Sequence, residues 1–100
     1  MNITSEGSTL QVAGLAELNA ANASAFRDQV RAAIQPQHVN VLLDFSQTRF
    51  VDSSGLGALI SIHKSLCGRG GVVRILNPTP PVQQILELTR MHRIFEVTRS

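Results

Sequence analysis

The chain has 100 residues, of which 43% are hydrophobic and 16% are charged. This length and composition predict one folded domain, residues 1–100, and exclude both a disordered chain and two independent cores. The net charge is +2, but the nine Lys and Arg residues are scattered and phenylalanine is the only aromatic residue type. The pattern therefore argues against a nucleic-acid-binding surface, which clusters basic and aromatic side chains.

Cysteine usage and hydrophobic runs narrow the protein class further. Cys67 is the only cysteine, which excludes an internal disulfide and a cysteine metal cluster. Residues 1–6 lack the basic and apolar regions of a signal peptide, and the longest apolar stretch, Leu56 to Ile62, is too short to span a bilayer. We expect a cytoplasmic protein without membrane insertion, and with neither a cofactor nor a metal site.

The first half of the chain predicts a hairpin, a helix and a strand. Residues 3–6 and 9–12 alternate around Gly7-Ser8, which is typical of a β-hairpin. Apolar spacing predicts a helix over residues 20–34, with Phe26 and Val30 on its buried face and Asn19 or Asn22 as its cap. The continuous apolar run over residues 39–45 predicts a central strand covered on both faces.

The second half predicts two further helices and two further strands. A helix is expected over residues 54–67, ended by the glycine-rich residues 68–71. A strand follows over residues 72–76. Prolines at residues 78–81 then open a third helix, and residues 94–97 form a last strand. The expected buried stripe of the second helix is Leu56, Leu59, Ile60, His63 and Cys67.

The order of these elements predicts the fold class. Strands that alternate with helices imply right-handed crossovers and a mostly parallel sheet. We therefore expect a single α/β domain with an N-terminal β-hairpin, in which helices pack on a mixed sheet of four or five strands. Asp44, at the end of the central strand, is expected either to orient the following loop by hydrogen bonds or to be solvated.

Asp52-Ser53-Ser54-Gly55 is the most informative motif, because a helix starts directly after a buried strand and a short connection. The serines are expected on the surface at the carboxyl end of a parallel strand, where open α/β sheets usually bind their ligands. A helix N-terminus favours an added phosphate, and phosphorylation adds about −1.5 to −2 charges. Gly55 and Gly57 should let a partner approach the backbone closely. A plain helix cap explains the same residues and is compatible with a phosphorylation site.

Residues 50–59, Phe-Val-Asp-Ser-Ser-Gly-Leu-Gly-Ala-Leu, resemble the signature of the STAS family, named for sulphate transporters and anti-sigma factor antagonists. The neighbouring strand and helix patterns are similar to that family over the last two-thirds of the chain, and in outline over the first third. The resemblance implies a STAS-type domain. In the antagonist branch of the family, the serine directly after the aspartate is phosphorylated, and here that residue is Ser53.

The same resemblance implies a function as an anti-sigma factor antagonist. The unphosphorylated protein would bind an anti-sigma factor that is also an ATP-dependent serine kinase, and would thereby release a sigma factor. Phosphorylation would break the complex, and a PP2C-type phosphatase would reset it. The residues implied in the partner interface are Asp52, Ser53, Ser54, Gly55, Leu56 and Asn19. Asn19 ends a stretch that is longer than the family's Gly-x-Leu-Asp element and lacks its aspartate.

Two other functions are compatible with parts of the sequence. A STAS domain can also serve as a constitutive subunit, for example of a stressosome-like assembly or a lipid-transport complex, and the altered stretch before Asn19 leaves room for this. An enzyme is disfavoured, because the Gly-x-Ser-x-Gly and phosphate-loop motifs are absent. His63 would lie about 15 Å from Ser53 along one helix, whereas a catalytic base needs about 3 Å. We expect His63 to be a packing residue and Cys67 a buried, inert thiol.

Overall fold

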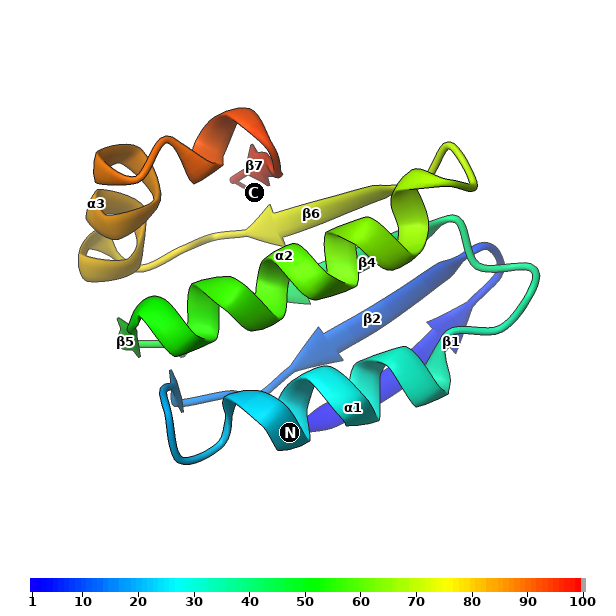
Figure 1. Ribbon diagram of the computed structural model, residues 1–100, viewed down its shortest axis with the longest axis horizontal. Coiled ribbons are helices and arrows are strands. Elements are labelled where there is room, and N and C mark those ends of the chain that lie inside the picture. Colours follow the sequence, from blue (N-terminus) through cyan, green and yellow to red (C-terminus); the bar gives the residue numbers. More distant parts are fainter. Residues whose placement is uncertain (100) are drawn as a thin grey trace.

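The computed structural model describes residues 1–99 and forms one α/β domain of two layers, a sheet and a set of helices (Figure 1). The strands are β1 (Asn2–Glu6), β2 (Thr9–Ala13), β3 (Glu17–Leu18), β4 (Asn40–Asp44), β5 (Phe50–Val51), β6 (Val72–Leu76) and β7 (Glu96–Thr98). The helices are α1 (Ala23–Ala33), α2 (Ser53–Cys67), α3 (Pro80–Leu88) and a short 3₁₀ helix, η1 (Met91–Arg93). The predicted hairpin, three helices and mixed sheet are confirmed.

The main sheet has five strands in the order β1-β2-β4-β6-β7. The β1–β2 hairpin is antiparallel, with Gly7 at φ 61° in its turn, and the other three pairs are parallel. Each parallel strand adds beside the previous one, so every crossover runs in the same direction along the sheet. Because such crossovers are right-handed, all the connecting helices fall on the same face. Figure 1 shows α1 and α2 side by side across this face.

Among residues 1–99, no helix covers the other face of the sheet, so the prediction of a central strand covered on both faces is wrong. In β4, Val41 and Leu43 are completely buried beneath the helices, whereas Asn40, Leu42 and Asp44 are half-exposed on the opposite face. The run of apolar residues suggested a fully covered strand, but the single direction of the crossovers leaves one face open. The Asp44 carboxylate accepts a hydrogen bond from the Ser46 N–H at 3.0 Å, so it orients the loop that follows β4.

The core between the helices and the sheet is aliphatic, with three buried phenylalanines, Phe26, Phe45 and Phe95. Two polar side chains are completely buried with them. The Nδ1 atom of His38 accepts from the Gln35 N–H at 2.9 Å, and its Nε2 atom lies 2.7 Å from the Ser5 hydroxyl. The Thr48 hydroxyl donates to the Leu15 carbonyl. These bonds satisfy the buried polar atoms of His38 and Thr48 and attach the connecting loops to the sheet.

Helix α2 is rotated relative to the predicted stripe. Leu59, Ile62 and Leu66 are completely buried, whereas Ile60 is half-exposed. Cys67 is exposed, so its predicted burial is wrong. His63 is a half-buried packing residue, as predicted, and its ring meets that of Phe95 edge-on at a centroid distance of 5.9 Å. Within residues 1–99, no helix combines the length and apolar character needed to cross a membrane.

Candidate functional site

A second, two-stranded sheet builds the candidate site. β3 pairs in parallel with β5, with Leu18 opposite Val51, and the Asp52 N–H donates to the Leu18 carbonyl at 3.1 Å. This pairing places the turn that follows Leu18 beside the first residues of α2. Figure 1 shows β5 at the end of the domain where α2 begins. Neither strand is predicted from the sequence, because two residues are too few to show a periodic pattern.

The connection that leads to β5 is held by buried hydrogen bonds. The Thr48 side chain is completely buried, and the Thr79 hydroxyl, at the start of α3, donates to the Thr48 carbonyl. The Arg49 N–H donates to the Ala16 carbonyl at 2.8 Å. The loops that follow β2, β4 and β6 therefore hold this segment in place. Such attachment gives the start of α2 a defined position at the carboxyl edge of the sheet.

Asp52 caps α2 and also joins two loops. One oxygen of its carboxylate accepts from the Gly55 N–H at 2.9 Å, which is the usual bond of a helix cap. The other oxygen accepts from the Ala20 N–H at 3.1 Å. Asp52 is therefore the capping residue, and both oxygens of its carboxylate are hydrogen-bonded within the domain. These bonds fix the spacing between the Asn19 turn and the start of α2.

Asn19 lies in the turn that Asp52 holds, next to the start of α2. Its side-chain oxygen accepts from the Ala21 N–H at 3.0 Å, and its own N–H donates to the Asn22 side chain at 2.8 Å. Its carbonyl accepts from the N–H groups of Asn22 and Ala23. Asn19 therefore shapes the turn before α1, and neither predicted cap residue forms a side-chain cap at the start of that helix. The structure brings Asn19 and Asp52 together although they lie 33 positions apart in the chain.

Ser53 and Ser54 are the first two residues of α2, and both are exposed. Within residues 1–99, neither hydroxyl forms a hydrogen bond, because Asp52 already provides the cap. The first-turn N–H groups of α2 carry the positive end of the helix dipole, and no acidic side chain lies in that turn. The two serine hydroxyls are therefore accessible to a reacting group at a helix N-terminus, where N–H groups favour an added phosphate and where the cap already carries the Asp52 carboxylate.

The glycines near these serines have different surroundings. Gly55 is buried, and a Cβ atom placed there would lie 2.7 Å from the Leu18 carbonyl oxygen. The prediction that Gly55 opens the backbone to a partner is therefore wrong, since its missing side chain makes room for β3. At Gly57, by contrast, no atom lies within 4 Å of such a Cβ, so this position is open as predicted. Leu56 is only 7% exposed and belongs to the core.

Two exposed residues of this region were not predicted as site residues. Phe50 is 48% exposed, because the alternation of β5 buries its neighbour Val51 instead. Arg49 lines a hollow of about 500 Å³ that the loops at the carboxyl edge of the sheet surround. The sequence signal that could have identified Phe50 as exposed was its position directly before a buried strand residue, because neighbouring strand residues point to opposite faces. The segment just before α2 thus exposes an aromatic ring and a cation in addition to the two serine hydroxyls at the helix start.

Comparisons with known proteins identify what the chain is similar to. The model of the STAS domain family matches residues 2–100. A Thermotoga maritima protein, whose name provisionally assigns it to the anti-sigma factor antagonists, is 32% identical over 82 residues, which are 81% of this chain and 73% of that protein. The anti-sigma F factor antagonist of Paenibacillus polymyxa is 28% identical over 82 residues, which are 81% of this chain and 70% of that protein.

Solved structures agree with this fold. The unphosphorylated form of the anti-sigma factor antagonist SpoIIAA is similar to 99% of this chain over 86% of its own length, with a TM-score of 0.86 and 21% identity. The phosphorylated form of SpoIIAA from Bacillus is similar to 99% of the chain over 89% of its own length, with a TM-score of 0.77 and 20% identity. At these identities, the likeness establishes a shared fold.

Proposed function

The chain is a STAS domain of the anti-sigma factor antagonist family, and from this we propose that it is a protein-binding module switched by phosphorylation of Ser53. In its unphosphorylated form it binds an anti-sigma factor that has serine kinase activity, and it thereby releases a sigma factor. Phosphorylation of Ser53 breaks this complex, and a PP2C-type phosphatase restores the binding form. The cycle takes place in the cytoplasm.

One observation carries the proposal: Ser53 is exposed at the first position of α2 and its hydroxyl is free, while Asp52 caps the helix. Phosphorylation of Ser53 would therefore remove no hydrogen bond that the domain needs. The added charge of about −1.5 to −2 would lie at the positive end of a helix, which tolerates it well. The modification would thus change the surface and leave the fold intact, as a binding switch requires.

The surface around Ser53 also supports binding to a protein. Phe50, three residues before Ser53, exposes nearly half of its surface, and Gly57, in the first turns of α2, has open space around its backbone. Exposed aromatic residues often anchor protein interfaces. A phosphate added beside such an apolar contact would have to be desolvated on binding, which opposes association. SpoIIAA, one of the structural neighbours, has solved structures in unphosphorylated and phosphorylated forms.

We propose binding rather than catalysis because the free hydroxyls have no partner that would activate them. A nucleophilic serine needs a base within hydrogen-bonding distance. Neither Ser53 nor Ser54 has a side-chain partner within the described part of the chain. The only histidine on α2, His63, packs against Phe95. This supports the proposal that Ser53 accepts a phosphate that another protein supplies.

Phosphosite mapping is the experiment that tests this function. The folded protein is incubated with ATP and the serine kinases of the source organism, then digested with trypsin. The peptide Phe50 to Lys64 contains Ser53, Ser54 and Ser61, and tandem mass spectrometry distinguishes them. Phosphate on Ser53 is the expected result. Absence of phosphate with every kinase, from protein with native circular dichroism, would contradict the switch and favour a constitutive STAS subunit of a larger complex.

A further inference from the structure

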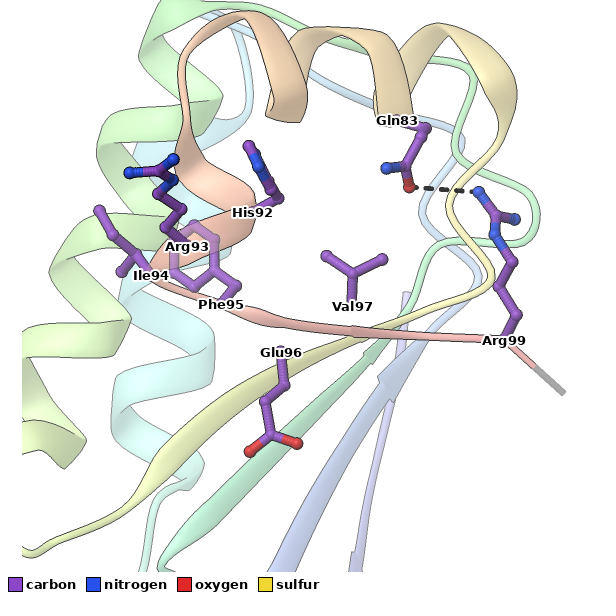
Figure 2. Close-up of a pocket in the computed structure, with 8 residues that line it drawn as sticks. All are labelled: Gln83, His92, Arg93, Ile94, Phe95, Glu96, Val97 and Arg99. Atoms are coloured by element: carbon purple, nitrogen blue, oxygen red, sulfur yellow. Dashed lines mark hydrogen bonds between the residues drawn. The ribbon is translucent and has the colours of Figure 1, made fainter.

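The outer edge of β7 forms one side of an open groove. The groove has a volume of about 550 Å³ and lies between this strand and the helices α3 and η1. Figure 2 shows Gln83 of α3 and His92 of η1 above the strand, with Val97 pointing toward them. Ile94, at one end of the groove, is 40% exposed. The groove therefore combines apolar side chains with a strand at the edge of the sheet.

The unpaired backbone groups of β7 can be identified from the ladder. In a parallel pair, the N–H and C=O of one residue point to the same neighbouring strand, and those of the next residue point away. The Thr98 carbonyl accepts from the Asn77 N–H at 2.8 Å, so Thr98 faces β6. Val97 must then direct its N–H and C=O outward, along the edge that lines the groove. Unpaired edges of this kind are templates for a further strand.

The described residues that line the groove include two arginines and one glutamate, and the lining Gln83 side chain donates to the Glu87 carboxylate at 3.0 Å. Arg93 lies at one end and Arg99 at the other (Figure 2). Within the described residues, Arg93 has no side-chain partner, and the Arg99 guanidinium donates only to uncharged acceptors, the Pro78 carbonyl and the Gln83 side chain. Glu96 is the one carboxylate among the described lining residues. It points away from the groove, and its carboxylate lies 3.3 Å from the Arg74 guanidinium.

We propose that an extended acidic segment of a partner protein binds in this groove by adding a strand to the outer edge of β7. The outward N–H and C=O of Val97 bond its backbone, and Arg93 and Arg99 bind carboxylates at its two ends. The positive charges of Arg93 and Arg99 favour an acidic segment over a neutral or basic one. A second copy of the chain paired through its own β7 would bring the same arginines together, which disfavours that pairing. The proposal is independent of Ser53.

Two labelled peptides test the proposal with the full chain. One is a heptapeptide in which valine alternates with glutamate, and the other has lysine in place of each glutamate. We expect fluorescence polarisation to show binding of the acidic peptide that weakens as salt is added, and at least about tenfold weaker binding of the basic peptide. Equal affinity for the two peptides, or no binding of either at low salt, would overturn the proposal.

Variants of the protein locate the contact. Arg93→Glu and Arg99→Glu should each weaken binding of the acidic peptide at least about fivefold, because attraction becomes repulsion. Arg31→Glu is the matched control, since Arg31 is exposed on α1 and changes the net charge equally. The affinity of the Arg31→Glu variant for the acidic peptide should stay within about twofold of that of the unchanged protein. Equal losses in all three variants would show a general charge effect and would refute the groove.

The backbone contact is tested separately. Val97→Pro removes an outward N–H and leaves the bonds to β6 in place, so the peptide should bind more weakly. Hydrogen exchange in the unchanged protein provides a second measurement that does not depend on how the variant folds. Bound peptide should slow exchange of the Val97 amide. Unchanged exchange at Val97 under saturating peptide, or a self-associated chain whose β7 edge is already protected without peptide, would contradict the proposal.

Discussion

Ser53 and Ser54 are both exposed at the start of α2, and the residue before them, Asp52, determines what their hydroxyls are needed for. Asp52 caps α2 through the Gly55 N–H and holds the Asn19 turn through the Ala20 N–H. A serine in the cap position would need its own hydroxyl for that bond. Since the aspartate performs the capping, both serines keep free hydroxyls at a helix N-terminus. One residue thus stabilises the helix while the next is available for modification.

Replacement of Ser53 tests the proposed switch directly. Ser53→Asp should abolish binding to the anti-sigma factor, because it places a charge where the phosphate would be. Ser53→Ala should bind like the unchanged protein and resist phosphorylation. Isothermal titration calorimetry with the purified anti-sigma factor measures both. Ser8→Asp, in the exposed hairpin turn, adds the same charge elsewhere and should not affect binding. Binding of Ser53→Asp at unchanged affinity would refute the switch.

The two glycines of α2 should respond in opposite directions to alanine. Gly55→Ala places a Cβ atom 2.7 Å from the Leu18 carbonyl oxygen and should lower the free energy of unfolding by about 1–3 kcal/mol. Gly57→Ala meets no atom within 4 Å and should raise the free energy of unfolding by about 0.5–1 kcal/mol, through better helix propensity. Urea denaturation followed by circular dichroism measures both. Similar changes at the two positions would argue against the packing of Gly55 on β3.

At the scale of the element, α2 shows why a helix with many apolar residues is hard to orient from its sequence. Leu56, Leu59, Ile60 and Ile62 spread over nearly half of the helix circumference, so more than one stripe fits the spacing. Packing against α1 and the sheet selects the face that contains Leu59, Ile62 and Leu66. Ile60 is half-exposed and Cys67 is exposed, so both lie outside this buried face. The Cys67 thiol is consequently exposed at the end of the helix.

This orientation predicts unequal costs for two adjacent truncations. Leu59→Ala should lower the free energy of unfolding by about 2–5 kcal/mol, because it leaves a cavity in the core. Ile60→Ala removes a half-exposed side chain and should have a clearly smaller effect. Chemical denaturation of the two variants gives the difference. An Ile60 effect equal to or larger than that of Leu59 would mean that α2 is rotated toward the stripe expected from its sequence.

At the scale of the whole molecule, the sheet is covered on one side only. Every crossover from β2 to β7 moves in the same direction, which places the helices together and leaves the opposite face open. That face contains polar residues and a half-exposed leucine, Leu42, in its central strand. In the described part of the chain, the open face is thus accessible in addition to the Ser53 site and the β7 groove. The Ser53 site and the β7 groove are the ones for which a partner is proposed.

Adjacent leucines of β4 test this one-sided arrangement. Leu43→Ala should lower the free energy of unfolding by about 2–5 kcal/mol, since its side chain is completely buried beneath the helices. Leu42→Ala, on the open face, should cost less than about 1.5 kcal/mol. Thermal and urea unfolding of both variants measure the contrast. Equal costs would indicate that something covers the open face in solution, such as a second copy of the chain.

The sequence alone predicted the hairpin, the three helices and the strands of the main sheet in their order, and exposed serines at the start of the second helix, but not β3, β5 or η1. The predicted elements depend on local signals such as turn residues, apolar spacing and prolines, which act over a few neighbouring positions. Only the tertiary structure decided that β3 pairs with β5, that Gly55 packs on Leu18, and which faces of α2 and β4 are buried. Each of these depends on contact between segments distant in the chain, because burial is set by what packs opposite a residue and not by its neighbours in sequence.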